Sequence, residues 1–178
     1  MSDEKNVSEE FPSAKLLLDV SRYEYDKEFS RTDTIDNKAN IALTFASVLL
    51  VAVAPTMNIN KLLNIPIYNF FEAILPVSYL FLIVTGMILL LCSIFSLINV
   101  ISTKPYKTID VQSQYDRENL KTKEDLLSSA LINYYIKATV ANGEINFSRV
   151  KKYKKALYLM VLSMVLLVVS FVIGNSIL

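Results

Sequence analysis

The sequence predicts an all-α membrane protein with three transmembrane helices, an amphipathic cytosolic helix before them and a helical cytosolic segment between the second and third. Three apolar runs, at residues 41–57, 73–100 and 156–178, contain no Asp, Glu, Lys or Arg. A bilayer core of about 30 Å needs about 20 helical residues, so the second and third runs cross it outright. The first run is shorter, and we expect residues 37–40 to complete its cytosolic end.

Residues 1–40 precede the first run and are rich in charged side chains. Leu18, Tyr25 and Phe29 recur at helical spacing and form one apolar stripe of an amphipathic helix. A half-apolar helix of this size is marginal in water unless the stripe packs against a partner. We expect residues 101–155 to supply that partner.

Residues 101–155 begin with a polar, turn-like stretch and continue as a helix-compatible one. Asn142 followed by Gly143 predicts a break or kink in that helix. Together with residues 1–40 the segment holds about ninety residues, enough for a small bundle but few for an independent core. We therefore expect a homo-oligomer, in which neighbouring chains supply the missing burial.

Lys and Arg predict the orientation of the chain in the membrane. Six of the 18 precede the first run, Lys61 lies between the first two runs, and eleven lie at residues 101–155. Because cytoplasmic segments carry the excess of Lys and Arg, residues 1–40 and 101–155 are predicted to face the cytoplasm. The outer hairpin at residues 58–72 and the carboxyl end then lie outside.

Composition argues against an enzyme. The chain has no histidine, three glycines and a single cysteine, Cys92, which lies inside the second apolar run. These counts exclude a Ser-His-Asp or Cys-His pair, an imidazole base and a His-containing zinc site. No charged residue lies at membrane depth, where transporters and proton pumps usually place one. We therefore expect no catalytic residue, no metal and no cofactor.

Five basic residues precede the third apolar run: Arg149, Lys151, Lys152, Lys154 and Lys155. Juxtamembrane cations attract anionic headgroups at about 1 kcal/mol each and fix orientation, which is the main interpretation of this group. The alternative is that some of them bind an anionic ligand such as a nucleotide phosphate. No glycine-rich phosphate loop supports that alternative.

Weakly polar residues recur every seven positions along the second run and so share one helix face. They are Ser78, Thr85, Cys92 and Asn99. Small and weakly polar residues let helices approach closely in lipid, so this face is a candidate helix-packing seam. The alternative is a pore face in an assembly of several copies. A shorter face of the same kind on the third run holds Ser163, Ser170 and Gly174.

Asp36 and Lys38 lie in the last turns before the first run. The Lys38 side chain can extend to the headgroups, whereas a carboxylate so close to hydrocarbon requires a cationic or hydrogen-bonding partner. For Asp36 we expect that partner to be Lys38 of a neighbouring chain or Arg31.

Residues 35–39, Ile-Asp-Asn-Lys-Ala, end an amphipathic helix that passes directly into an apolar span. This membrane-boundary motif, with Asp36, Lys38 and Ala39 as its specific residues, resembles the transmembrane effectors of Pycsar, the bacterial pyrimidine cyclase system of antiphage defence. The similarity extends to the small size, the close first pair of spans and the Lys-Tyr-Lys entry to the last span at residues 152–154.

The resemblance implies a multi-pass protein of the bacterial inner membrane that is not an enzyme. An adjacent pyrimidine nucleotide cyclase, its functional partner, makes cyclic CMP or cyclic UMP on phage infection. This activating ligand leads the effector to impair the membrane, so that the cell dies before phage matures. The resemblance implies contact with lipid but not with nucleic acid, and it specifies no ligand-binding residue. Two alternatives stay open: a membrane effector of another nucleotide-signal defence system, or a structural subunit of a membrane complex.

Overall fold

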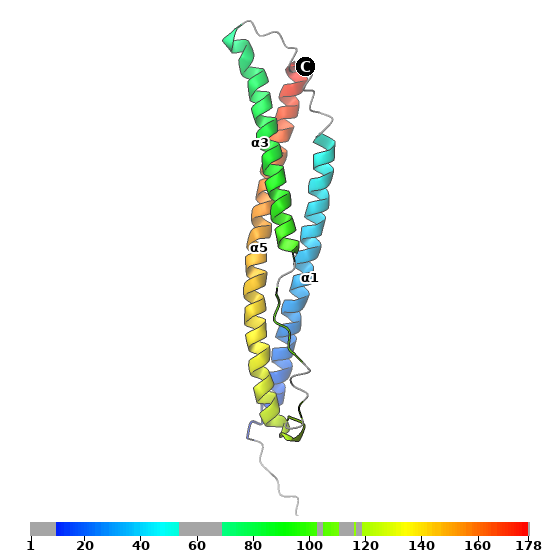
Figure 1. The fold of residues 1–178 in the computed structure, drawn as a ribbon, viewed down its shortest axis with the longest axis vertical. Coiled ribbons are helices and arrows are strands. Elements are labelled where there is room, and N and C mark those ends of the chain that lie inside the picture. Colours follow the sequence, from blue (N-terminus) through cyan, green and yellow to red (C-terminus); the bar gives the residue numbers. More distant parts are fainter. Residues whose placement is uncertain (1–9, 54–68, 103–104, 111–115, 117–118, 178) are drawn as a thin grey trace, which may run out of the picture. The chain divides into compact units, whose positions relative to one another are not determined.

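The computed structural model describes residues 10–53, 69–102, 105–110, 116 and 119–177. Its elements are, in chain order, α1 (Ala14–Val53), α3 (Phe70–Ile101), the 3₁₀ turn η2 (Asn119–Lys121) and α5 (Glu124–Ile177) (Figure 1). Every element in these ranges is helical, which confirms the predicted all-α fold. Residues 58–68 of the predicted outer hairpin lie outside the described residues.

Three of the described helices, α1, α3 and α5, are long and apolar enough to cross a membrane. They overlap the three apolar runs, so the prediction of three membrane-crossing helices is confirmed. α1 and α5 have 40 and 54 residues and also include most of the amphipathic and cytosolic segments predicted to flank the membrane. Both are therefore much longer than the roughly 20 residues that a bilayer core takes.

α5 passes through Asn142 and Gly143 without interruption, so the break predicted there is wrong. Among the described residues none has a positive φ, the conformation in which a glycine usually ends a helix. An asparagine disfavours a helix interior when its side chain competes for the backbone of its own helix. The Asn142 side chain instead bonds the backbone of the segment at residues 105–110, and the helix continues.

The chain divides into two compact units. The polar unit comprises residues 1–34 and 103–148, and the membrane unit comprises residues 35–102 and 149–178. The polar unit includes the amino-terminal parts of α1 and α5 together with residues 105–110. The membrane unit includes all of α3 and the apolar parts of α1 and α5.

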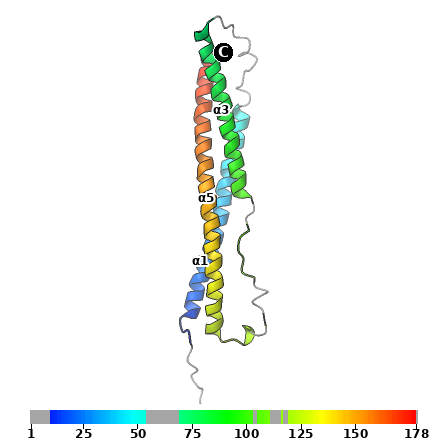
Figure 2. The same cartoon turned by 60° about the vertical axis from the view of Figure 1, so that its left-hand side comes forward.

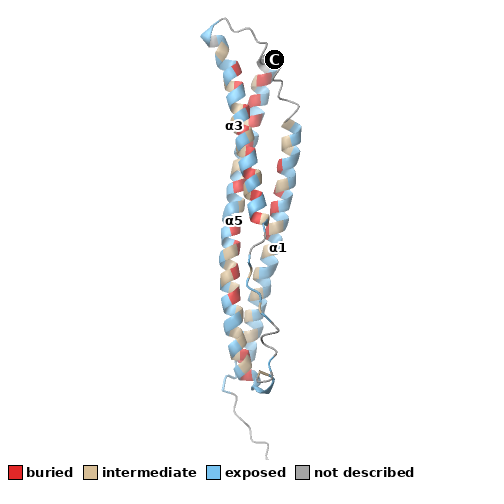
Figure 3. Ribbon diagram, viewed as in Figure 1, coloured by how far each residue is buried: buried red, intermediate tan, exposed pale blue. Residues whose placement is uncertain are grey.

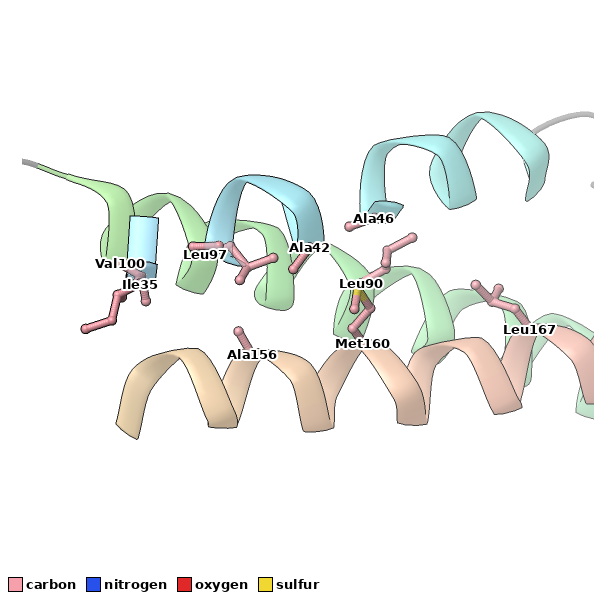
Figure 4. Close-up of a cluster of buried hydrophobic side chains, with 10 residues drawn as sticks. Ile35, Ala42, Ala46, Leu90, Leu97, Val100, Ala156, Met160 and Leu167 are labelled. Carbon is pink, nitrogen blue, oxygen red and sulfur yellow. The ribbon is translucent and has the colours of Figure 1, made fainter. Parts of the chain in front are cut away.

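Three helices lie side by side in the membrane unit (Figure 2) and bury a narrow apolar seam. Figure 4 shows side chains from all three helices pointing into it. The buried residues of the seam are Ile35, Ala39, Ala42, Ala46, Leu90, Leu97, Val100, Ala156, Met160 and Leu167. Steps of four and three residues, as in the α1 members, are the spacing of left-handed coiled-coil packing. The alanines let the helix backbones approach closely, as small residues do in lipid.

Two serine hydroxyls join α3 to α5 in the membrane unit. Ser93 Oγ donates a hydrogen bond to the Ala156 carbonyl oxygen at 2.8 Å, and Ser163 Oγ donates one to the Gly86 carbonyl oxygen at 2.8 Å. All three residues of the short face predicted on the third run, Ser163, Ser170 and Gly174, are buried. Figure 3 shows buried positions along both α3 and α5. The prediction that this face associates with another helix is confirmed.

The seven-residue face predicted on the second run is not the face of α3 that packs inside the chain. Ser78 and Thr85 are half-buried, and Cys92 and Asn99 are exposed. The buried face lies one position further on, at Tyr79, Gly86, Ser93 and Val100. A contact between the predicted face and another copy of the chain, as a packing seam or a pore face, stays a prediction.

Alanine at Gly174 and alanine at Gly143 are expected to change stability in opposite directions. A Cβ at Gly174 lies 2.7 Å from Cε2 of the buried Tyr79 ring, so a packed group must shift. Because overpacking costs about 1–3 kcal/mol, we expect Gly174→Ala to lose about 1–2 kcal/mol. At Gly143 the nearest atom, Cδ of Glu28, is 3.9 Å away, so Gly143→Ala gains about 0.5–1 kcal/mol from helix propensity.

Thermal unfolding of the two variants in one detergent, followed by circular dichroism, checks this pair. Each serves as the control for the other, since the substitution is the same and only the surroundings differ. Midpoints that move in the same direction would contradict the close contact between Gly174 and Tyr79.

Candidate functional site

Asp125, the second residue of α5, ties the segment before α1 to the start of α5 in the polar unit. Its carboxylate accepts hydrogen bonds from the N–H groups of Glu10 at 2.8 Å and Phe11 at 3.2 Å. Burial acts to raise the pKa of Asp125, but the backbone N–H donors together outweigh it and hold this pKa below its ordinary value. The carboxylate is therefore charged at neutral pH, the form that accepts both bonds most strongly.

Asn142 holds residues 105–110 against α5. Its Oδ1 accepts a hydrogen bond from the Lys107 N–H at 2.8 Å, and its Nδ2 donates one to the Lys107 carbonyl oxygen at 3.0 Å. The Asn142 side chain is 1% exposed, so both bonds are shielded from water. A segment without secondary structure needs such partners for its backbone when it packs against a helix. The paired bonds therefore fix the backbone at Lys107.

Tyr25 of α1 reaches the same segment. Its hydroxyl donates a long hydrogen bond of 3.5 Å to the Lys107 carbonyl oxygen, and its ring lies edge-on to Tyr135 with centroids 5.6 Å apart. Burial, followed by the neighbouring Tyr135 and Asp26, raises the pKa of Tyr25. The hydroxyl therefore stays protonated at neutral pH and remains a donor.

Asn146, one turn after Asn142, is the centre of a second set of bonds in the polar unit. Its Oδ1 accepts from the Tyr106 hydroxyl at 2.9 Å and from the Thr32 hydroxyl at 3.3 Å. Its Nδ2 donates to the Glu28 carbonyl oxygen and to Glu28 Oε2, both at 3.0 Å. The residue has no exposed surface. One side chain thus joins α1, α5 and the segment at residues 105–110.

The inward face of α1 in the polar unit is more polar than the predicted stripe. Leu18 and Tyr25 are half-buried, but Phe29 is 48% exposed, so the stripe prediction is wrong at that position. Glu28 and Thr32 occupy inward positions instead. From these positions the two residues form hydrogen bonds with Asn146 of α5.

A hollow of about 310 Å³ lies between residues 105–110 and α5, inside the polar unit. Its lining residues are Lys107, Thr108, Ile109 and Asp110 from the segment and Tyr134, Lys137 and Ala138 from α5. Two of these residues are lysines and one is an aspartate, so the residues that line the hollow carry a net positive charge. Its volume is at the lower end of the range of about 300–1,000 Å³ that small-molecule sites occupy. The arrangement suits a small anion with a hydrophobic part.

Asp36 pairs with Arg149 in the membrane unit. Nη2 of Arg149 donates a charge-assisted hydrogen bond to Asp36 Oδ1, and Nε of Arg149 donates another to the Val100 carbonyl oxygen at 2.9 Å. Arg149 is 3% exposed. The partners expected for Asp36, Arg31 or Lys38 of a neighbouring chain, are therefore corrected to an arginine of the same chain. The physical reason is that α5 brings a buried cation next to the carboxylate, which satisfies both charges.

Arg149 is buried, unlike the other four members of the basic group before the third apolar run. Lys151, Lys152, Lys154 and Lys155 are exposed, the placement that contact with headgroups requires. Within the membrane-boundary motif Lys38 is exposed, whereas Ala39 is fully buried in the apolar seam. The motif therefore combines a residue that packs in the apolar seam, Ala39, with a residue that forms an ion pair, Asp36.

Sequence reasoning missed Asn142 and Asn146 as hydrogen-bonding centres and gave no role to residues 105–110. One signal was present. Two asparagines four residues apart share a helix face, and asparagine is unfavourable inside a helix unless its side chain bonds elsewhere. Within the described part of the chain, no three or more His, Cys, Asp or Glu residues are grouped so that they could hold a metal ion.

Three apolar helices around a seam of small residues, together with a polar helical unit, define a multi-pass α-helical membrane protein. The chain belongs to the Pycsar effectors, since the family model PycTM, described as the Pycsar effector protein domain, matches residues 24–174. This match confirms the resemblance seen at residues 35–39 and identifies a membrane effector of antiphage defence. Neither a curated protein nor a solved structure matches the chain.

Proposed function

We propose that this effector is activated by a cyclic pyrimidine nucleotide, cyclic CMP or cyclic UMP, which a partner cyclase makes on phage infection. The activated effector impairs the inner membrane, and the infected cell dies before phage matures. The family match over residues 24–174 carries the proposal. On this proposal the protein acts by rearranging membrane helices, not by catalysing a reaction.

The energetics of such a switch favour an assembly of several copies. A ligand shifts a conformational equilibrium only by its difference in affinity for the two states, and a change from 1:99 to 99:1 takes about 5.5 kcal/mol. In a homo-oligomer, several bound nucleotides add their contributions to one transition. The exposed Cys92 and Asn99 on α3 leave a face for contact between copies within this proposal.

The membrane potential of bacteria that produce the protein tests the proposal. A voltage-sensitive dye reports the potential in cells that also carry a cyclase for cyclic CMP or cyclic UMP. We expect depolarisation with the active cyclase and a normal potential with an inactivated cyclase. The effector must be present in the membrane fraction at equal amounts in both strains.

Other outcomes favour the alternatives. An unchanged potential with both nucleotides, despite membrane insertion, overturns activation by a pyrimidine nucleotide and favours another messenger. Harmless overproduction together with co-purification in a larger membrane complex favours a structural subunit.

A further inference from the structure

We infer that the hollow between residues 105–110 and α5 is the site at which this protein binds a cyclic pyrimidine nucleotide. Lys107 and Lys137 hold the phosphate and Tyr134 contacts the base. The inference rests on the proposed function for the class of ligand and adds to it the residues that bind the ligand.

Charge is the first argument. The cyclic phosphodiester carries one negative charge, and the residues that line the hollow include two lysines and one aspartate. Lys107 belongs to the segment and Lys137 to α5, so the two lysines come from different walls of the hollow. Ammonium groups bind phosphate oxygens by charge-assisted hydrogen bonds. Asp110 also lines the hollow.

The apolar part of the lining suits a base. The Tyr134 ring is 53% exposed and lines the hollow together with Ile109 and Ala138. Aromatic side chains provide a surface on which a nucleobase stacks. A volume of about 310 Å³ is small for a ligand site, which favours one mononucleotide with a single-ring base over a dinucleotide.

The wall that carries Lys107 is held in place before a ligand arrives. Asn142 bonds both the N–H and the carbonyl oxygen of Lys107 from a position that is 1% exposed. The Tyr25 hydroxyl donates a further, longer bond to that carbonyl oxygen. A binding segment whose backbone is already fixed loses less conformational freedom on binding, and this preorganisation increases affinity.

A second hollow with a lysine in its lining is less suited to a nucleotide. Lys154, Leu157, Tyr158 and Val161 line a space of about 390 Å³ in the membrane unit. All four belong to α5, so this hollow has a single wall, and only one of the four carries a charge. Among the described residues, the hollow of the polar unit therefore combines two cations, an acceptor and an aromatic ring in a way that this one does not.

Binding of cyclic CMP and cyclic UMP to the purified full-length protein tests the site. Equilibrium dialysis with labelled nucleotide is performed in a detergent that carries no phosphate. We expect Lys137→Glu to weaken binding by at least about tenfold, the effect of losing one charge-assisted hydrogen bond, and Lys107→Glu to do the same. Lys123→Glu makes the same change in charge at an exposed lysine outside the hollow, and we expect it to bind within about twofold of the wild type.

Two variants of Tyr134 examine the contact with the base. Tyr134→Phe keeps the ring and is expected to retain binding, whereas Tyr134→Leu removes it and is expected to weaken binding severalfold. Because Tyr134 is exposed, neither change disturbs a buried core. Circular dichroism of every variant verifies that its helix content equals that of the wild type.

The possible failures can be told apart. If the wild type binds a pyrimidine nucleotide and the variants of Lys107, Lys137 and Tyr134 bind it equally well, the site is wrong while the proposed function stands. If the wild type binds neither nucleotide, the proposed function is overturned, and the site with it. Displacement of the nucleotide by an equimolar amount of phosphatidylglycerol would assign the hollow to a lipid headgroup and overturn the inference.

Discussion

Arg149→Met is expected to destabilise the protein by about 2–4 kcal/mol, a larger loss than any change among the neighbouring lysines. Arg149 is 3% exposed and bonds both the Asp36 carboxylate and the Val100 carbonyl oxygen. Methionine keeps the apolar stem of the side chain but leaves Asp36 without the cation. The Asp36 side chain is 34% exposed, so water partly solvates its carboxylate once the arginine is removed. The expected loss is therefore below the 3–5 kcal/mol typical of a fully buried pair.

Thermal unfolding followed by circular dichroism measures this loss, because the chain contains no tryptophan for fluorescence. Lys151→Met is the matched control, since it removes an exposed cation two residues further along α5 and is expected to change stability by about 0.5 kcal/mol or less. Adding Asp36→Asn to Arg149→Met is expected to restore part of the stability, because no unpaired charge is left. Equal melting of the Arg149 and Lys151 variants would show that the pair contributes nothing.

The three membrane-crossing helices could be predicted from sequence because the requirement is local. An uncharged apolar run that is long enough for the bilayer core is most stable as a helix that spans the membrane. The partner of Asp36 could not be predicted in this way. Arg149 lies 113 residues away and becomes its neighbour only through the packing of α1 against α5. Because Arg149 lies close to Lys151 and Lys152 in the sequence, it was assigned to the same basic group.

On α3 the predicted seven-residue repeat has the correct spacing but lies on a different helix face from the one that packs inside the chain. The seven-residue repeat was predicted from polarity, at Ser78, Thr85, Cys92 and Asn99. The buried repeat is one residue further on, at Tyr79, Gly86, Ser93 and Val100. Weakly polar side chains can face lipid at little penalty, so close approach of the backbones decides the face, and Gly86 and Ser93 permit it. Size alone does not identify this face either, because it also holds Tyr79 and Val100.

The helix break predicted in the polar unit was wrong for a different reason. Asn142 and Gly143 carry a local signal for a helix end, and this signal was outweighed by a contact distant in the sequence, from Asn142 to Lys107. Side-chain bonds of this kind depend on which segment lies opposite, and residues 105–110 have no periodic pattern that would reveal it. The candidate nucleotide site could not be predicted from the sequence for the same reason, because its two walls come together only in the folded unit.

Asn146→Leu is expected to destabilise the polar unit by about 2–6 kcal/mol, because it removes four hydrogen bonds of about 0.5–1.5 kcal/mol each from a residue without exposed surface. Leucine has the branching of asparagine and a larger volume, so the change leaves no cavity and adds some overpacking to the loss of the bonds. The polar groups that bonded Asn146 would then lie against an apolar side chain, which adds their desolvation to the loss.

Amide hydrogen exchange, measured by mass spectrometry on the intact protein, locates the effect of this change. Asn146→Leu should speed exchange at residues 24–34, whose helix is bonded through Glu28 and Thr32, while exchange in α3, which has no bond to Asn146, stays at the wild-type rate. Asn133→Leu, at an exposed position of the same helix, is the matched control and should leave both rates unchanged. Exchange that is equally slow in the two variants would mean that the four bonds do not hold α1 to α5. Faster exchange throughout the chain would mean that the polar unit does not open separately from the membrane unit.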